Sequence, residues 1–198
     1  MKEIIFATSN SGKVATLRRA LASAGVDVTV RQEVLPIVEP QADTAIEVAK
    51  VKARLAHDMT GRAVLVDDSS FHIEALNGFP GPYAKYMNET IGAEGYLKVM
   101  QGIADRTAYF LNALVFVDDD GAQHSFEGSK YTGTITDYID DHSDPTAWSI
   151  LFNIFMPDGC DKVLARLTTE ERKEAEKRIL TRDSYAEFGA WLKKSLDR

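Results

Sequence analysis

The chain begins with a short apolar strand that ends in a polar turn and passes directly into a helix. The strand is Ile4-Ile5-Phe6-Ala7, and the turn is Thr8-Ser9-Asn10-Ser11-Gly12-Lys13. Apolar residues at helical spacing follow at once, at Val14, Leu17 and Leu21. A strand, a tight turn and a helix in this order favour an α/β fold.

The turn can be interpreted in two ways. Backbone N–H groups and the positive end of a helix dipole meet there, which suits an anion. The charge of Lys13 opposes the dipole in the first helical turn, so its position makes most sense beside something negative. An ordinary N-capped helix with a solvated lysine explains the same residues. The turn alone leaves both interpretations open.

The rest of the chain carries strand and helix patterns without an internal repeat. Apolar runs and alternation predict strands over residues 27–31, 63–66, 107–117, 124–135 and 150–156. Capping residues and helical spacing predict helices over residues 44–55, 83–88, 93–101, 168–178 and 183–196.

These elements predict a single α/β domain over residues 1–198, with a mixed central sheet flanked by helices. A long hairpin over about 107–136, turning at Asp118-Asp119-Asp120-Gly121, would form part of a second lobe. We expect two lobes with a substrate cleft between them.

Composition excludes several classes of protein. A formal net charge of −7 argues against broad binding to nucleic acid. The sequence shows no apolar run that could span a bilayer and no signal-peptide pattern. The single cysteine, Cys160, excludes an internal disulfide framework and favours a cytoplasmic protein.

Three acidic residues suggest a metal site. Asp67 and Asp68 follow a buried apolar run, at the kind of strand end where open α/β folds place ligands. Glu39 lies in a polar loop that could reach the same region. Carboxylates of this kind suit Mg²⁺, which leaves its remaining positions to water and substrate phosphates. A solvent-facing acidic turn is the simpler explanation for the aspartate pair by itself.

Four segments, in this order and spacing, resemble the inosine triphosphate pyrophosphatase family. Members of that family hydrolyse inosine, xanthosine and related triphosphates. The matching segments are Thr8-Ser9-Asn10-Ser11-Gly12-Lys13, Glu39-Pro40, Val66-Asp67-Asp68-Ser69 and Leu76-Asn77-Gly78-Phe79-Pro80-Gly81-Pro82-Tyr83-Ala84-Lys85-Tyr86.

The resemblance implies roles for the matching positions. Glu39 and Asp68 would bind Mg²⁺ with support from Asp67, and Asp68 would orient or deprotonate the attacking water. The residues that would contact the triphosphate or neutralise its charge are Thr8, Asn10, Lys13, Lys52, Ser69 and Lys85. The products would be a nucleoside monophosphate and pyrophosphate, and the protein would be a homodimer.

The C-terminal part departs from the family where its members read the base. Phe152 stands in place of an aspartate, and Arg172 in place of a helical lysine. Lys177 and Arg178 fall where the family has a Ser-His-Arg triplet. Phe152 could still stack on a base, and Arg172, Lys177 or Arg178 could meet a carbonyl oxygen. Because base-reading polar groups are missing, we expect an altered base preference.

We therefore expect a Mg²⁺-dependent pyrophosphatase that acts on non-standard purine nucleoside triphosphates at the α–β bond. The same departures allow two alternatives. One is a nucleotide-binding module with weak or lost catalysis. The other is a pyrophosphatase with a changed base preference, for example toward a modified pyrimidine triphosphate.

Overall fold

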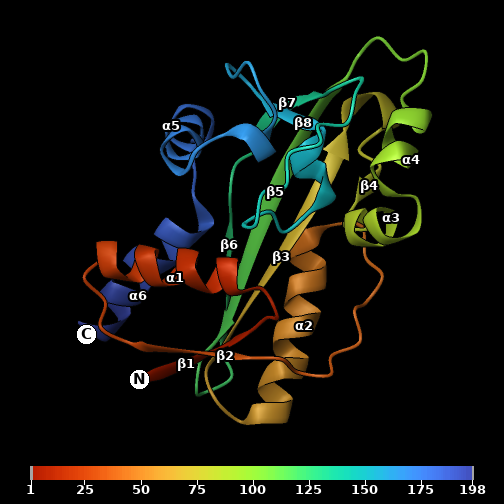
Figure 1. Cartoon of the computed structure of the whole chain (residues 1–198). Helices are drawn as coiled ribbons and strands as arrows, with labels where there is room; N and C mark the ends of the chain where they lie inside the picture. The colour runs from red at the N-terminus through yellow and green to blue at the C-terminus, as the bar shows by residue number, and fades with distance from the viewer. Residues whose placement is uncertain (1, 198) are drawn as a thin grey trace. The chain divides into compact units, whose positions relative to one another are not determined.

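The computed structural model describes residues 2–197 in two compact units (Figure 1). The first unit comprises residues 2–69, 112–128 and 182–197, and the second comprises 70–111 and 129–181. Residues 1 and 198 of the predicted domain lie outside the described part. Among the described helices, none is long and apolar enough to cross a membrane.

The first unit is an α/β unit with a mixed sheet in the strand order β2-β1-β3-β5-β6. Strand β1 pairs in parallel with β2 and β3, whereas β6 is antiparallel to β5. Its strands are β1 (Glu3–Ala7), β2 (Thr29–Glu33), β6 (Gln123–Glu127) and the parts of β3 (Val64–Ile73) and β5 (Thr107–Val117) that belong to this unit. Its helices are α1 (Ser11–Ser23), α2 (Ala45–Thr60) and α6 (Ser184–Leu196).

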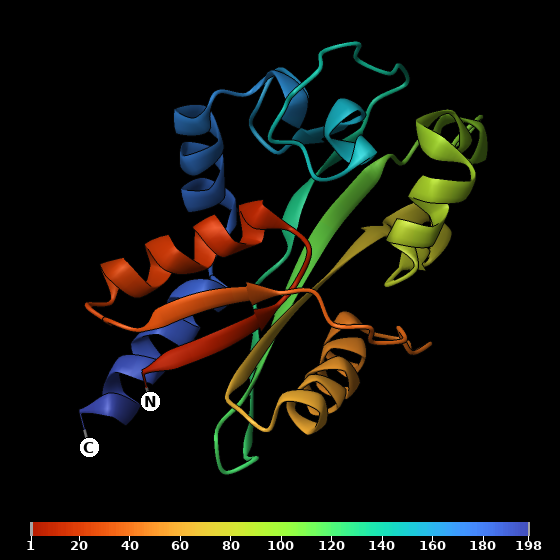
Figure 2. The ribbon, with the colours of Figure 1, turned by 60° about the horizontal axis from the view of Figure 1, so that its bottom comes forward.

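Two apolar layers cover the faces of this sheet. Figure 2 shows α1 and α6 on one side of the strands and α2 on the other. Along β3, Leu65 packs into the layer of α1 and α6, whereas its neighbours Val64 and Val66 pack into the layer of α2. This alternation is the two-residue period of a strand, and it fixes the face of every residue that follows on β3.

The second unit contains the remaining parts of β3 and β5 and a separate core. Its strand order is β4-β3-β5-β7-β8, with β5 antiparallel to β7 and β7 antiparallel to β8. Phe71, Tyr96 and Phe155 are fully buried in this core. Its other elements are β4 (Pro80–Gly81), β7 (Tyr131–Ile135), β8 (Phe155–Pro157), α3 (Ala84–Thr90), α4 (Gly92–Val99), α5 (Thr169–Ile179) and the 3-10 turns η1 (Glu74–Leu76), η2 (Ile150–Asn153) and η3 (Leu164–Arg166).

The predicted α/β class with a mixed sheet flanked by helices is confirmed, and most helices lie where the spacing places them. Three strands were predicted incorrectly. The strand expected over 63–66 continues as β3 to Ile73, because Phe71 and Ile73 are buried in the second core. The strand expected over 124–135 is divided into β6 and β7. The segment 150–156 is a 3-10 turn followed by the start of β8.

The predicted hairpin contributes to both units. Residues 112–128, which include its turn, lie in the first unit, and its flanks at 107–111 and 129–136 lie in the second. The polar residues at 128–130 interrupt the strand pattern between β6 and β7. The predicted single domain and cleft remain predictions.

Gly133 allows β7 and β8 to pair closely. A Cβ atom built on Gly133 would lie 2.3 Å from the Met156 carbonyl oxygen and 2.5 Å from a ring atom of Phe155. We expect Gly133→Ala to lower the free energy of unfolding by about 3 kcal/mol, because the strands must separate to admit the methyl group. Urea unfolding measures this change.

Gly128→Ala is the matched control, since an added Cβ there finds its nearest atoms at 3.6 Å, an ordinary contact. Both substitutions restrict the unfolded chain in the same way. Equal stability of the two variants would contradict the described packing of β7 against β8.

Candidate functional site

The turn after β1 is a capped helix start. The Asn10 side chain accepts hydrogen bonds from the backbone N–H groups of Gly12 at 2.9 Å and Lys13 at 3.3 Å. The Thr8 hydroxyl accepts from the Asn10 backbone N–H at 3.1 Å, and Gln32 of β2 donates to the Thr8 carbonyl at 3.1 Å. The helix cap is therefore confirmed, but the solvated lysine of that interpretation is wrong, because Lys13 is paired with Asp67 of β3. A capped helix start still presents its positive dipole end, and the amide NH₂ of Asn10 is not consumed by capping.

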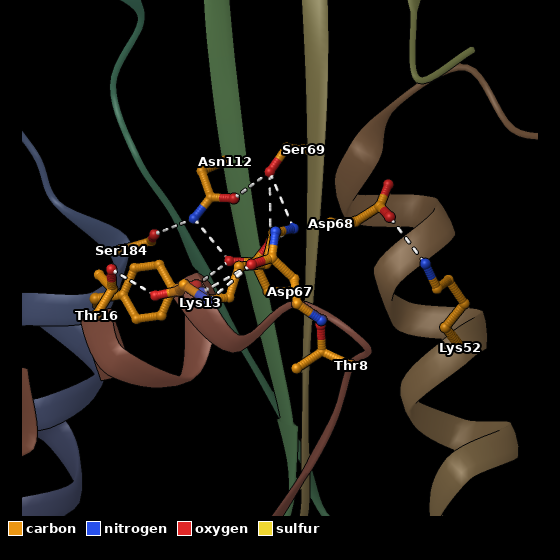
Figure 3. Close-up of polar contacts among 12 residues, drawn as sticks. Thr8, Lys13, Thr16, Lys52, Asp67, Asp68, Ser69, Asn112 and Ser184 are labelled. Carbon is orange, nitrogen blue, oxygen red and sulfur yellow. Dashed lines mark hydrogen bonds and ion pairs between the residues drawn. The ribbon is translucent and has the colours of Figure 1, made fainter. Parts of the chain in front are cut away.

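Lys13 extends from this turn to Asp67 of β3. Its ammonium group forms an ion pair with Asp67 Oδ1 and lies 3.3 Å from the Ser69 hydroxyl (Figure 3). The Asp67 side chain is only 1% exposed, whereas that of Lys13 is 20% exposed. Lys13 is therefore anchored by a buried carboxylate and retains access to solvent.

The second oxygen of Asp67 is held by residues from β5 and α6. The Tyr185 hydroxyl donates to Asp67 Oδ2, and the Asn112 amide donates to the same oxygen at 3.2 Å. Asn112 also donates to the Ser184 hydroxyl at 3.2 Å and accepts from the Ser69 hydroxyl at 2.8 Å. A carboxylate with this many donors is well compensated for its burial.

A second ionic group lies around Lys52 of α2. Its ammonium group is 2.9 Å from Asp68 Oδ1 and 2.9 Å from Glu39 Oε1. The Asp68 side chain is 10% exposed and that of Glu39 is 49% exposed, so the group opens to solvent on the Glu39 side. Two carboxylates thus converge on a single cation.

The two aspartates belong to separate ionic groups because β3 continues through both of them, and adjacent residues of a strand face opposite sides of the sheet. Asp67 follows the parity of Leu65 and faces α1 and α6, whereas Asp68 follows Val64 and Val66 and faces α2. Figure 3 shows Asp67 beside Lys13 and Asn112, and Asp68 directed to Lys52. The expectation of an acidic pair at a strand end is wrong, because both residues lie within the strand.

Burial and pairing change the acidity of these groups. Burial raises the pKa of Asp68 to about 6, although the charge of Lys52 acts in the opposite direction. Burial alone would lower the pKa of Lys52, but Asp68 and Glu39 outweigh it, and the pKa is raised. Burial, together with the charge of Asp67, raises the pKa of Tyr185 well above its usual range, so its hydroxyl remains a donor.

The donor set fits a hard divalent cation at Glu39 and Asp68. Their oxygens already meet at one positive charge, and Mg²⁺ takes one or two carboxylates while leaving its other positions to water and phosphates. Asp67 lies on the other face with both oxygens engaged. No cluster of three or more His, Cys, Asp or Glu residues suited to a metal occurs in residues 2–197.

The remaining predicted residues lie in the second unit. Arg172 of α5 donates to Asp144, to Thr146 and to the Leu164 carbonyl, and its guanidinium lies 5.3 Å from the ring centre of Phe152. Phe152 is buried. The structure thus brings Arg172 and Phe152 together, with most of the guanidinium engaged in holding the 144–146 segment.

The other three predicted residues of the second unit have different surroundings. Lys85 is exposed on α3. Lys177 is exposed and pairs with Glu174 at 2.7 Å on the same helix. Arg178 donates to the Asp158 carbonyl at 2.6 Å and contacts the Cys160 sulfur at 3.3 Å.

Sequence reasoning missed Asn112, Ser184 and Tyr185. Asn112 is a lone amide in the otherwise apolar run Tyr109–Val117, and that interruption was a usable signal. Ser184 and Tyr185 open a helix with ordinary composition, so no local pattern distinguishes them. Their position beside Asp67 depends on where α6 packs.

The raised pKa of Asp68 predicts a stability change with pH. Between its ordinary value of 3.8 and about 6, the folded state keeps a proton that the unfolded state has lost. The unfolding free energy therefore falls as pH rises through this window and then levels. Asp68→Asn cannot titrate at this position, so its unfolding free energy should not show this fall. In urea unfolding with a chelator present, we expect the unfolding free energy of Asp68→Asn minus that of the unsubstituted protein to rise by about 2 kcal/mol between about pH 4.5 and 7.5.

Asp27→Asn serves as the control, because Asp27 is exposed. Its effect on stability should be small, because the substitution removes no buried contact. A pH-independent effect of Asp68→Asn would show that this carboxyl titrates normally in the folded protein.

Comparison with known proteins gives a consistent result. Residues 4–187 match the Ham1 family. A dITP/XTP pyrophosphatase from Methanopyrus kandleri is 34% identical over 186 residues, covering 94% of this chain and 95% of the relative. One from Thermococcus kodakarensis is 35% identical over 193 residues, covering 98% of each.

Solved structures share the fold. The crystal structure of a nucleoside-triphosphatase / dITP/XTP pyrophosphatase from Mycobacterium abscessus superposes with a TM-score of 0.71 at 26% identity. The superposition covers 89% of this chain and 94% of that one. With the match over residues 4–187, the chain belongs to the Ham1 family, and the resemblance found in the four segments is confirmed.

Proposed function

We propose that this protein is a nucleoside triphosphate pyrophosphatase that releases a nucleoside monophosphate and pyrophosphate. The observation that carries the proposal is a pair of lysines, Lys13 and Lys52, each held by an aspartate of β3 and each still open to solvent. Relatives named dITP/XTP pyrophosphatase support the substrate class.

The phosphate contacts are proposed at the start of α1 and beside it. The Asn10 amide and the Lys13 ammonium group would bind phosphate oxygens, with Thr8 shaping the turn. Lys52 would supply a further positive charge to the phosphates, and Ser69 would supply a hydroxyl group. Fixed cations of this kind stabilise the charge that develops on a leaving pyrophosphate.

Glu39 and Asp68 would hold Mg²⁺, and Asp67 would support the site from the other face of β3 by anchoring Lys13. When bound, the metal offsets negative charge on the phosphate oxygens. Asp68 would also orient the attacking water and accept its proton. Asp68 is buried and its Oδ1 atom is paired with Lys52, which supports a defined orientation for that carboxylate.

The base preference is proposed to differ from that of relatives with the usual base-reading residues. Phe152 and Arg172 form a contact that could meet a base, whereas Lys177 and Arg178 are engaged elsewhere in the second unit. Lys85 would remain available to a phosphate because it is exposed on α3. Arg172 is less free to read a base than the sequence suggested, since it also binds the 144–146 segment.

Two properties of the whole protein belong to the proposal. The family resemblance suggests a homodimer, and the single cysteine suggests the cytoplasm. The net charge of −7 argues against nucleic acid as a partner, and the proposed partner is a nucleoside triphosphate held by local lysines.

The activity is tested by incubating the protein and Mg²⁺ with standard and deaminated purine and pyrimidine nucleoside triphosphates. We expect monophosphate and pyrophosphate in equal amounts, with the largest rates for a subset of the panel. A chelator should abolish turnover and added Mg²⁺ should restore it. Triphosphate binding without product would instead favour the nucleotide-binding module, and release of inorganic phosphate would refute cleavage at the α–β bond.

Asp68→Asn tests the proposed base. The amide cannot accept the proton of the attacking water, so kcat should fall by about 100-fold or more while triphosphate binding is retained. Turnover assays and calorimetry measure the two quantities. Asp27→Asn, which changes an exposed aspartate in the same way, should retain full turnover, and similar kcat values for both variants would exclude the role of Asp68.

A further inference from the structure

Three side chains around Asp67 have no place in the chemistry proposed above. Asn112 comes from β5, and Ser184 and Tyr185 come from the start of α6. The sequence separates them widely from Lys13 and Asp67, yet all of these residues lie in the first unit. Their contacts converge on one carboxylate.

The two oxygens of Asp67 face different partners. Oδ1 is paired with Lys13, and Oδ2 accepts from the Tyr185 hydroxyl and from the Asn112 amide at 3.2 Å. With 1% exposure of its side chain, Asp67 has almost no access to water that could replace a lost donor. Removal of one donor must therefore be compensated by the remaining partners.

The orientation of the Asn112 amide is itself determined. Its oxygen accepts from the Ser69 hydroxyl at 2.8 Å, and its nitrogen donates to the Ser184 hydroxyl at 3.2 Å and to Asp67 (Figure 3). A flipped amide would place its oxygen against the Asp67 carboxylate, which cannot donate a hydrogen bond. Asn112 is therefore a fixed donor to Asp67.

Lys13 is partly open to solvent, with 20% of its side chain exposed. Two of its three ammonium hydrogens can be directed to Asp67 and to the Ser69 hydroxyl, which leaves one for a ligand. A phosphate bound at Lys13 shares the positive charge of that ammonium group with Asp67. Donors on Oδ2 withdraw negative charge from Asp67 and so weaken its hold on Lys13.

We propose that Tyr185 and Asn112 are positioning residues that act through Asp67 to set how Lys13 presents its ammonium group to a phosphate. This inference rests on the proposed function only in its assignment of Lys13 to the phosphate. It assigns a role in phosphate binding to the C-terminal helix, through the hydroxyl of Tyr185.

The test is a double-mutant cycle measured by calorimetry with inorganic tripolyphosphate as the probe. Tyr185→Phe should weaken binding about tenfold, because Asp67 loses a charge-assisted hydrogen bond and retains Lys13 more strongly. In the Lys13→Met background the same substitution should have no further effect, since its influence passes through Lys13. Asn112→Ala approaches Asp67 from β5 and should show the same dependence on Lys13.

Tyr96→Phe is the matched control. Tyr96 is another buried tyrosine, and its hydroxyl donates to Asn88 at 3.0 Å in the second unit. Its removal should leave tripolyphosphate affinity unchanged. Urea unfolding of every variant identifies any that fail to fold, and Asn112→Ala then tests the role if Tyr185→Phe is one of them. In turnover assays, Tyr185→Phe should raise KM more than it lowers kcat.

Three results would overturn the inference. Unchanged affinity in both folded variants would show that the hydroxyl and amide do not influence phosphate binding. An equal loss in the presence and absence of Lys13 would assign them a general structural role. Failure of the unsubstituted protein to bind tripolyphosphate would remove Lys13 as a phosphate contact. Binding without hydrolysis of any nucleoside triphosphate would refute the proposed function alone, because the binding cycle would still decide the role of Tyr185.

Discussion

The candidate site depends on the burial of one charged group, the Asp67 carboxylate. An ionised carboxylate removed from water is strongly destabilising unless several donors replace the water. Lys13 of α1, Asn112 of β5 and Tyr185 of α6 supply those donors. Because the partners come from three distant segments, the buried charge couples the start of α1 to the start of α6, two helices that cover the same face of the sheet.

The alternation of β3 determines what each acidic residue can do. Asp67 and Asp68 are adjacent in sequence, but they face opposite layers of the first unit, so they meet different lysines. Asp67 is enclosed and positions Lys13, whereas Asp68 shares Lys52 with the half-exposed Glu39. A carboxylate that remains open to solvent on one side suits metal and water, and an enclosed carboxylate suits anchoring. The same strand thus supports both parts of the proposed chemistry.

Much of the fold and part of the site could be predicted. The turn from Thr8 to Lys13, the capped start of α2 near Thr44 and the helices at 169–179 and 184–196 follow from local patterns, since caps and helical spacing are local properties. The strand end expected at 66 is wrong, because β3 contributes apolar residues to both cores and its polar residues 67–70 lie within the strand. Pairing of Lys52 with Glu39 was not visible from their separation in the sequence.

The sequence by itself determined the types of group available: an anion-compatible turn, carboxylates after an apolar run, and lysines that could meet phosphate. Those features are local, and the four ordered segments made the family recognisable. Only the tertiary structure decided which groups meet. It separated Asp67 from Asp68 by strand parity, engaged Arg172 with the 144–146 segment and brought Tyr185 to Asp67. Such contacts depend on the packing of distant elements, which short-range sequence patterns do not specify.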